Sequence, residues 1–267
     1  MKTPLISHEI PHSLAEAELV GDYKINDYNF ILLHRYIDDA RYRDIIDQYI
    51  SNKQFTILDN SCFELGEALS NDLIVKYVDI IQPQIFVLPD VLGDMQATLK
   101  RTREFLKTYP SLESNAMAVI QGNTPEEFIE CYKVYDNEFP NLPMIGIPFC
   151  FNWAFENKLT PVEHALERVK LIDKLDKHIN KDTLHHLLGT WAALEFKFYH
   201  KYKWIYSIDT SNPIAAAIDG DKYTSAGVFK KPKIKFDDFV NLPLTKINID
   251  SIMYNVGVFK ELVKNGR

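Results

Sequence analysis

Carboxylate and amide side chains follow several short hydrophobic runs of this chain, at the point where each run ends. Asp59, Asp90 and Asp209 end three of these runs, and Gln121 ends a fourth. A carboxylate in a pocket can act as a nucleophile or as a general acid or base. Taken singly, each aspartate is explained by capping the loop that follows it. Four polar residues at equivalent strand ends are a stronger signal, because closing a barrel brings those ends to one rim.

The elements that must position these residues follow a regular order. Runs that are apolar on both faces predict parallel strands covered by helices. Such runs begin near residues 30, 55, 85, 116, 144, 185 and 204. Helix-like segments follow or separate them, at residues 40–50, 69–81, 94–109, 124–135, 160–175 and 191–202, and residues 248–265 predict a closing helix. Successive strand–helix–strand units at this spacing indicate a parallel sheet.

Seven strand–helix units are readable, and an eighth strand is expected within Ile214–Val228. The best fit is an α/β fold, a (β/α)8 TIM-type barrel, forming a single domain over residues 1–267. The alternative is an open doubly wound sheet. The chain has 267 residues, of which 46% are hydrophobic. That length is normal for one such barrel and supplies a sizeable core.

Composition excludes several classes of protein. No apolar stretch approaches ~18 residues, so no membrane span is predicted. The first residues lack the apolar core of a signal peptide, which predicts a cytoplasmic location. Cys62, Cys131 and Cys150 are far apart and form no zinc-binding pattern. No metal site is therefore predicted. There is no glycine-rich nucleotide fingerprint either, so no nucleotide cofactor is predicted.

The net charge of −7 argues against a large nucleic-acid footprint. Two stretches, His200–Trp204 and Phe229–Phe236, are nevertheless basic and carry aromatic residues. Solvated lysines explain both stretches more simply. His185 and His186 are adjacent on a predicted strand, so they point to opposite faces and cannot both bind one metal. We expect buried, hydrogen-bonded histidines. Glu64 and Glu67 follow Asp59 closely, and a solvated loop is the simpler interpretation of both.

The order of motifs resembles the guanine transglycosylase superfamily, the tRNA-guanine transglycosylases and their relatives. That family reads Asp-Ser-Gly-Gly-(Phe/Tyr)-Gln after its second core strand, where this chain has Asp-Asn-Ser-Cys-Phe-Glu at Asp59–Glu64. An aspartate after an apolar run comes next, and Asp90 occupies that place. The family's Val-Gln-Gly-Gly then corresponds to Ile-Gln-Gly-Asn at Ile120–Asn123.

The resemblance continues to the family's nucleophile. Gly-Ile-Pro-Phe at Gly146–Phe149 stands where the family has Gly-Leu-Ala-Val-Gly. His-His-Leu-Leu-Gly at His185–Gly189 stands where it has His-Tyr-Leu-Met-Gly. Asp209 follows some twenty residues later, at the position of the nucleophilic aspartate. No single motif is intact, but order and spacing agree from Asp59 to Asp209, which is well over half of the chain.

The resemblance implies a role for each matching residue. Asp209 would attack the anomeric carbon of a nucleoside and hold a covalent glycosyl-enzyme intermediate. Asp59 would be the general base that deprotonates the incoming base. Asp90 would accept the N1–H and N2–H of guanine, while Gln121 and the Gly146 amide would reach its O6 and N7 side.

Three further residues complete the substrate site that the resemblance implies. Phe63 and Leu188 would sandwich the purine ring, and Asn60 would belong to the same substrate-binding set. Guanine's Watson–Crick edge offers two adjacent donors and one acceptor, which a carboxylate and amide groups complement. Breaking the N-glycosidic bond passes through an oxocarbenium-like state that a carboxylate can trap. A polymer substrate must flip the guanine out of its stack.

Departures from the family pattern narrow the expectation. The tRNA enzymes carry a zinc-binding Cys-x-Cys-x-x-Cys…His segment after the nucleophile, whereas all three cysteines of this chain precede Asp209. The Pro-Thr-Arg stretch is replaced by Thr210–Pro213. Without these segments, the motifs of this chain most resemble those of the DpdA-type relatives, which insert 7-deazaguanines into DNA.

We therefore expect a phage-related enzyme of the host cytoplasm that exchanges guanine in DNA for a base such as preQ0 or preQ1. It would need no cofactor, and a partner protein or a homodimer is left open. Three alternatives remain open too. The first is the same chemistry on tRNA. The second is a non-catalytic barrel subunit that binds a nucleobase or a partner. The third is an unrelated barrel hydrolase that uses its carboxylates with a divalent metal.

Overall fold

Eight parallel strands form a nearly closed barrel in the computed structural model, which describes residues 3–265. Neighbouring strands are hydrogen-bonded in the order β1-β8-β7-β6-β5-β4-β3-β2. The strands are β1 (Leu5–His8), β2 (Asn29–Leu32), β3 (Thr56–Asp59), β4 (Ile85–Val87), β5 (Ala116–Val119), β6 (Met144–Ile147), β7 (Leu184–Leu187) and β8 (Ile205–Thr210). This arrangement confirms the predicted TIM-type barrel and excludes the open doubly wound sheet.

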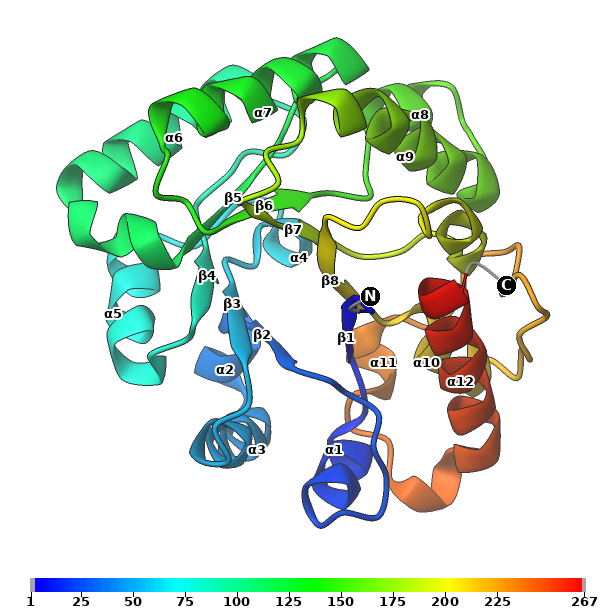
Figure 1. Cartoon of the computed structure of the whole chain (residues 1–267). Coiled ribbons are helices and arrows are strands. Elements are labelled where there is room, and N and C mark those ends of the chain that lie inside the picture. The colour runs from blue at the N-terminus through cyan, green and yellow to red at the C-terminus, as the bar shows by residue number, and fades with distance from the viewer. Residues whose placement is uncertain (1–2, 266–267) are drawn as a thin grey trace.

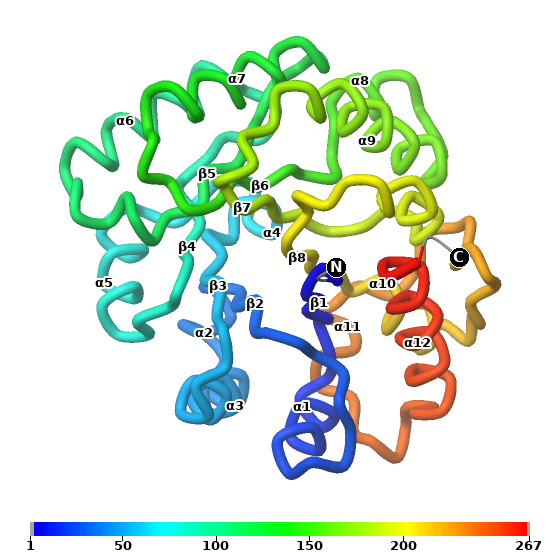
Figure 2. The backbone as a smooth tube through the Cα atoms, in the orientation of Figure 1, coloured from blue at the N-terminus to red at the C-terminus, as the bar shows by residue number. Residues whose placement is uncertain are grey.

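Helices surround the strands as an outer ring (Figure 1), and the chain goes once around the barrel from its blue to its red end (Figure 2). The α-helices are α1 (His12–Leu19), α2 (Leu33–Asp38), α3 (Ala40–Ser51), α4 (Cys62–Leu65), α5 (Asn71–Ile81), α6 (Met95–Thr108), α7 (Pro125–Glu138), α8 (Asn152–Glu156), α9 (Pro161–Leu175), α10 (Asn212–Ile218), α11 (Phe236–Phe239) and α12 (Ile249–Asn265). Short 3₁₀ helices are η1 (Pro110–Asn115), η2 (Asp176–His178), η3 (Ala193–Phe198) and η4 (Leu244–Lys246). The predicted helix between the last two strands is only η3.

The eighth strand is β1, at the N-terminal end of the described chain, so the expectation that it lies within Ile214–Val228 is wrong. That region instead contains most of α10, which starts beside Pro213. Proline fixes its own φ near the helical value and favours the first turn of a helix. β1 reads Leu-Ile-Ser-His, so half of its residues are polar. It therefore lacks the hydrophobic run that identifies most of the other strands.

Side chains close the seam between β1 and β2, the two strands at the ends of the ladder order. The Ile6 amide donates to Asp27 Oδ2 at 3.0 Å, and the Asp27 amide donates to the Ile6 carbonyl at 2.9 Å. The Phe30 amide donates to Ser7 Oγ at 3.1 Å. The side chains of Ser7 in β1 and of Asp27 before β2 therefore satisfy backbone amides that a direct strand pair would otherwise satisfy.

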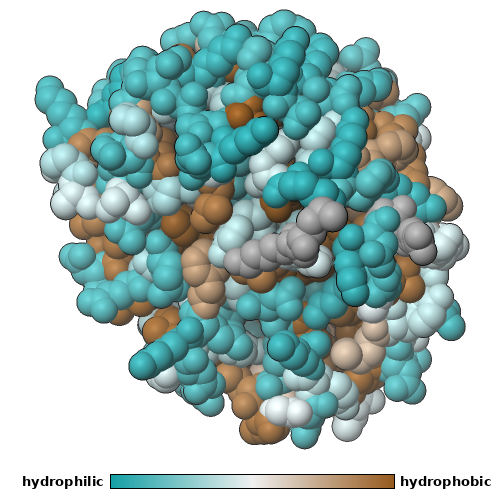
Figure 3. All heavy atoms as spheres, viewed as in Figure 1, coloured by the Kyte–Doolittle hydropathy of each residue, from teal (hydrophilic) through white to brown (hydrophobic). Residues whose placement is uncertain are grey.

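The hydrophobic core has two layers, as barrels require. The layer inside the barrel comprises Tyr28, Ile57, Ile85, Val87, Met117, Val119 and Met144. A larger layer fills the space between strands and helices. The face seen in Figure 3 is mainly hydrophilic, with hydrophobic side chains in small groups. Within residues 3–265, no helix has both the length and the hydropathy that crossing a membrane requires.

Candidate active site

The alternation of side chains along the strands brings polar residues to one rim of the barrel. Ile57 and Val119 point into the barrel, so Asp59 and Gln121, two residues further on, point the same way at the carboxyl ends of their strands. Asp209 lies near the end of β8 and pairs in register with Ser7 of β1. These side chains are buried, with Asp59, Gln121 and Asp209 9%, 2% and 7% exposed. The rim therefore has the predicted polar lining.

Asp209 is held by two donors on one oxygen. The Gly189 amide donates to Asp209 Oδ1 at 3.0 Å, and His186 Nε2 lies 3.0 Å from the same oxygen. His186 Nδ1 lies 2.8 Å from Ser207 Oγ, and its ring stacks on Phe30. The tautomer with its proton on Nε2 fits this arrangement, because a carboxylate only accepts. Both contacts favour a charged carboxylate at a fixed position.

Gly189 fits its position for two physical reasons. Its φ of +59° lies in the left-handed region, which side chains rarely adopt. A Cβ there would lie 2.4 Å from Cδ1 of Phe149. Only glycine therefore satisfies the backbone conformation and the close approach of the Phe149 ring together.

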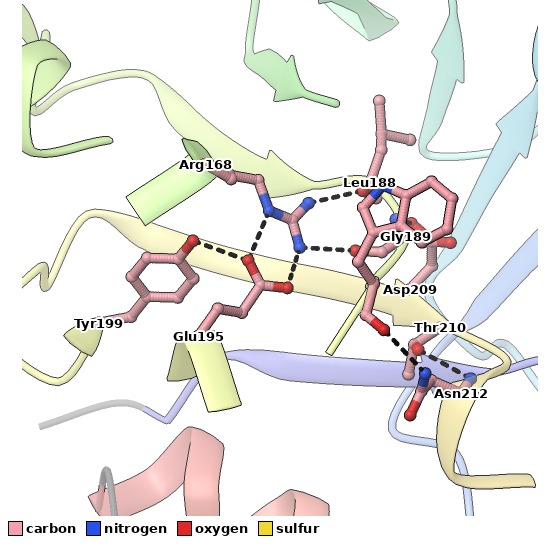
Figure 4. Close-up of polar contacts among 9 residues, drawn as sticks. Arg168, Leu188, Gly189, Glu195, Tyr199, Asp209, Thr210 and Asn212 are labelled. Carbon is pink, nitrogen blue, oxygen red and sulfur yellow. Dashed lines mark hydrogen bonds and ion pairs between the residues drawn. The ribbon is translucent and has the colours of Figure 1, made fainter. Parts of the chain in front are cut away.

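A buried ion pair fixes the loop that contains Gly189 (Figure 4). Arg168 of α9 donates to the carbonyls of Leu188 and Gly189 at 2.7 and 2.8 Å. The same guanidinium binds both carboxylate oxygens of Glu195, at 2.8 and 2.6 Å. Tyr199 donates its hydroxyl proton to Glu195 at 2.8 Å. Arg168 and Glu195 are 1% and 0% exposed, so the pair holds the Asp209-binding amide through groups shielded from water.

Asp59 has a different environment. Its Oδ2 accepts the Ser61 amide at 2.7 Å. Ser61 has a φ of +62°, and its Oγ accepts the His34 amide at 3.1 Å. Burial raises the pKa of Asp59 well above its usual range, and the charges of Glu64, Asp90 and Asp209 raise it further. Asp59 therefore holds its proton where an ordinary aspartate has lost it.

Asp90, Asn60 and Gln121 form one hydrogen-bonded group. Asn60 Nδ2 donates to Asp90 Oδ1 at 2.8 Å, and Gln121 Nε2 donates to Asp90 Oδ2 at 2.7 Å. Gln121 Oε1 accepts the Gly93 amide at 3.0 Å. Burial raises the pKa of Asp90, and the two amide donors oppose that shift. Each carboxylate oxygen can accept a second donor, so Asp90 keeps capacity for a ligand.

The two candidate walls of the substrate site and its candidate backbone amide lie on different parts of the chain. Phe63 of α4 is 51% exposed, and its ring centroid is 5.1 Å from that of Phe149. Leu188 packs against the layer inside the barrel. Gly146 lies within β6, and a Cβ there would be 3.2 Å from both Leu188 and Val119. Gly146 thus makes room for Leu188, while its predicted amide contact with a base stays a prediction.

Glu9 is a site residue that the sequence did not reveal. It directly follows β1, and its amide donates to the Thr210 carbonyl at 3.1 Å, next to Asp209. Burial raises the pKa of Glu9 to about 8, and the charges of Glu64 and Asp209 contribute. The pKa of Glu64 is raised to about 7, mainly by burial, yet its side chain is exposed at the surface. Water screens Glu64, so Glu9 carries the larger effect.

The guanidinium of Arg35 lowers the pKa values of both glutamates. It forms an ion pair with Asp237 and lies 5.5 Å from the Phe236 ring. His185 and His186 point to opposite faces as predicted. His185 stacks on Tyr132 outside the barrel, whereas His186 reaches Asp209 inside. The sequence could have indicated this role of His186, because it lies two residues before Leu188 and therefore points to the same, inner side of the barrel.

The rim thus combines Asp209, which accepts two donors, with Asp59, whose raised pKa favours the protonated form. Asp90, bound by two side-chain amides, lies beside them. Among residues 3–265, no group of three or more His, Cys, Asp or Glu side chains is arranged to hold a metal ion. No known protein-family model matches the chain, and a search of curated proteins finds no significantly similar sequence.

Proposed function

We propose that the chain is a base-exchange enzyme that replaces guanine in a nucleic acid by a 7-deazaguanine through a covalent Asp209 intermediate. The observation that carries this proposal is the pairing of two unlike carboxyl groups on one rim. Asp209 accepts two donors that favour its charged form, while the raised pKa of Asp59 keeps a proton available. A nucleophile and a proton donor are the two groups that retaining glycosyl transfer requires.

The first half-reaction uses both groups once. An Asp209 oxygen attacks C1′ of the nucleotide, and the bond from C1′ to N9 of guanine breaks. Its electron pair leaves with guanine, which takes the proton of Asp59 and departs as a neutral base. The products are an ester of Asp209 with the sugar and an ionised Asp59, whose charge is repelled by Asp90 and Glu64. That repulsion drives Asp59 to recover a proton.

The second half-reaction restores the enzyme. The incoming 7-deazaguanine loses its N9 proton to Asp59, and N9 attacks C1′ as the ester bond to Asp209 breaks. Asp59 thus serves as acid first and as the predicted base second, in keeping with microscopic reversibility. Asp90 would receive the N1–H and N2–H groups of either base, with Asn60 and Gln121 keeping its oxygens in place.

DNA is the substrate that we propose, because residues 210–267 contain no cysteine and so no zinc-binding segment of the kind found in the tRNA enzymes. The test is exchange of radiolabelled guanine into single-stranded DNA, duplex DNA and tRNA, side by side. Denaturing gels of the same reactions report the covalent adduct. We expect label and adduct on DNA, and label on tRNA alone would move the assignment to the tRNA branch.

Asp209→Asn should abolish both the adduct and the exchange, with a loss of at least about 10⁴-fold. Asparagine keeps an acceptor oxygen for Gly189 and His186, so the fold of the site should survive. Asp182→Asn on the exposed surface is the matched control and should exchange at the rate of the unchanged protein. Full activity of the Asp209→Asn protein would refute the mechanism.

A further inference from the structure

Two basic stretches stand out in this acidic chain, and the structure separates them. The stretch His200–Trp204 precedes β8, at the end of the barrel opposite the site. Its Lys201 is paired with Asp173 at 2.8 Å, and Lys203 donates to the carbonyl of His200. The stretch Phe229–Phe236, here called the lysine segment, follows β8 and α10 and reaches the rim that carries Asp209.

The lysine segment presents its charges outward. Lys231, Lys233 and Lys235 are exposed, whereas the alternating residues Pro232, Ile234 and Phe236 are partly buried. Ile234 and Phe236 pack against the hydrophobic core. Lys230 is different, because it is paired with Asp221 at 2.9 Å. Three lysines are therefore held on the outer side of an anchored segment.

Both ends of the lysine segment contact the site's surroundings. Lys231 Nζ lies 4.5 Å from the ring centroid of Trp191, in the loop after β7. Phe236 lies under the guanidinium of Arg35, which acts on Glu9 and Glu64. The Lys233 and Ile234 amides donate to Asp219 at the end of α10, the second of them at 3.3 Å. The segment thus borders the site between the loop after β7 and α2.

An aromatic series connects Lys231 to the candidate base-binding wall. Ring centroids are 5.4 Å apart between Trp191 and Phe149 and 5.1 Å apart between Phe149 and Phe63. Phe155 lies 6.0 Å from Trp191 on another side. Phe63, Phe155 and Phe229 are 51%, 50% and 56% exposed. Exposed aromatic faces beside lysines are the combination that binds an unstacked nucleic-acid strand.

Electrostatics requires a cationic surface near this site. The rim holds the carboxyl groups of Asp90, Asp209 and Glu64 besides two that retain a proton, and the whole chain has a net charge of −7. A polyanion must reach C1′ through this field. Lysines that neutralise its phosphates supply sequence-independent affinity. The lysine segment borders this rim, through Lys231 on Trp191 and Phe236 under Arg35.

We propose that Lys231, Lys233 and Lys235, with the exposed rings of Phe155 and Phe229, bind the single strand that flanks the nucleotide in the active site. This inference rests on the proposed function for its choice of a nucleic acid. The lysines contact phosphates, and the two rings stack on unpaired bases. The occupant is a nucleic-acid strand, since an acidic peptide would use the charges and leave the stacking rings without partners.

Fluorescence anisotropy with a labelled single-stranded DNA and an RNA of the same sequence tests the surface. The triple variant Lys231→Glu/Lys233→Glu/Lys235→Glu should bind at least about tenfold more weakly, and its plot of log affinity against log salt should be less steep by about two. The control, Lys53→Glu/Lys107→Glu/Lys177→Glu, makes the same charge change at exposed positions near the starts of β3, β5 and β7. It should bind like the unchanged protein.

Stacking is tested separately. Phe155→Ala should weaken binding roughly tenfold with little change in the salt slope. Phe198→Ala, also an exposed phenylalanine, is its control. Equal losses in both triple variants, no effect of Phe155→Ala, or no binding by the unchanged protein would overturn the surface. Displacement by polyglutamate at the concentration at which DNA competes would also overturn it.

The two proposals fail in different ways. Strand binding that depends on these lysines, without any guanine exchange or adduct, would refute the proposed function and keep the surface. Exchange into DNA that is unaffected by the triple variant would refute the surface and keep the function. Folding of each variant is checked by its unfolding transition in urea.

Discussion

Asp209 and Asp59 are held by the same backbone device in opposite electrostatic settings. Each accepts an amide from a residue with positive φ, Gly189 at +59° and Ser61 at +62°. Around Asp209 the supporting groups are donors, namely His186 and the loop fixed by Arg168. Around Asp59, burial raises the pKa, and the neighbouring carboxylates raise it further. The comparison teaches that chemical roles follow from the surroundings, since both residues are aspartates that accept an amide from a residue with positive φ.

Asp59→Asn should distinguish the role of Asp59 from that of Asp209 most strongly. Asparagine keeps an acceptor for the Ser61 amide but cannot give a proton to departing guanine. We expect adduct formation to slow by about 10²- to 10⁴-fold, the usual contribution of general acid catalysis. In the unchanged protein the rate should fall as the pH rises past the raised pKa of Asp59, and this dependence should vanish in the variant. Single-turnover adduct formation between pH 6 and 10 measures both effects.

If the rate of the Asp59→Asn protein still falls at alkaline pH, the group whose ionisation causes the fall is not Asp59. Glu9 is then the candidate, because the pKa of Glu9 is also raised. Adding Glu9→Gln to Asp59→Asn would decide between them. Asp182→Asn serves again as the surface control.

The buried ion pair behind Asp209 predicts the largest stability effect. Arg168→Met leaves Glu195 buried without its partner, and such a loss costs on the order of 3–5 kcal/mol. Urea unfolding measures that change. Arg168→Met/Glu195→Leu should regain most of the stability, because it removes both charges together.

Exchange kinetics distinguish positioning from mere stability in the same variants. The double variant should stay slow in kcat with a nearly unchanged KM, since the Leu188 and Gly189 carbonyls lose their donors. A normal kcat in the double variant, once its stability is regained, would show that Arg168 contributes to folding and not to the positioning of Asp209. Arg168→Lys, which keeps the charge and loses the fork of donors, should be intermediate.

Glu9, whose amide bonds the carbonyl of the residue after Asp209, predicts how the stability of the protein depends on pH. Its pKa is about 8 in the folded protein, against an ordinary value of 4.5. Between these values the unfolded chain ionises while the folded protein keeps the proton, so stability falls as the pH rises from 5 to 8. Glu9→Gln should remove this fall and gain roughly 2 kcal/mol at pH 8, less than the full shift implies because Glu9 is only partly buried.

Urea titrations at pH 5 and pH 8 check the Glu9 prediction. The variant and the unchanged protein should agree at pH 5 and differ at pH 8. Glu67→Gln, which changes an exposed glutamate near Asp59 in the sequence, should show no such difference. An equal gain at both pH values would mean that Glu9 is strained for a reason other than its charge.

The local hydrophobic pattern of the sequence predicted most strands and the polar rim. Contacts between residues far apart in the chain could not be predicted from it. Asp59, Gln121 and Asp209 follow hydrophobic runs that identify their strands, so their meeting on one rim could be predicted. The place of Glu9 on the rim could not be predicted, because β1 is half polar and its sequence shows no hydrophobic run. The Arg168–Glu195 pair joins residues 27 positions apart that belong to no shared periodic pattern. Burial of both charges is a property of the folded barrel alone.

The smallest expected effect tests whether the positive φ of Ser61 and the positive φ of Gly189 serve the same purpose. Ser61→Gly relieves a positive φ but removes the Oγ that accepts the His34 amide. The two contributions are each of order 1 kcal/mol and of opposite sign, so unfolding should change by less than about 1 kcal/mol. The Ser61 amide remains, so adduct formation should be kept. The reverse change, Gly189→Ala, puts a Cβ 2.4 Å from the Phe149 ring and should cost roughly 1–3 kcal/mol and slow the reaction. A cost of Gly189→Ala of no more than about 1 kcal/mol would mean that the positive φ, rather than the approach of Phe149, accounts for the glycine beside Asp209.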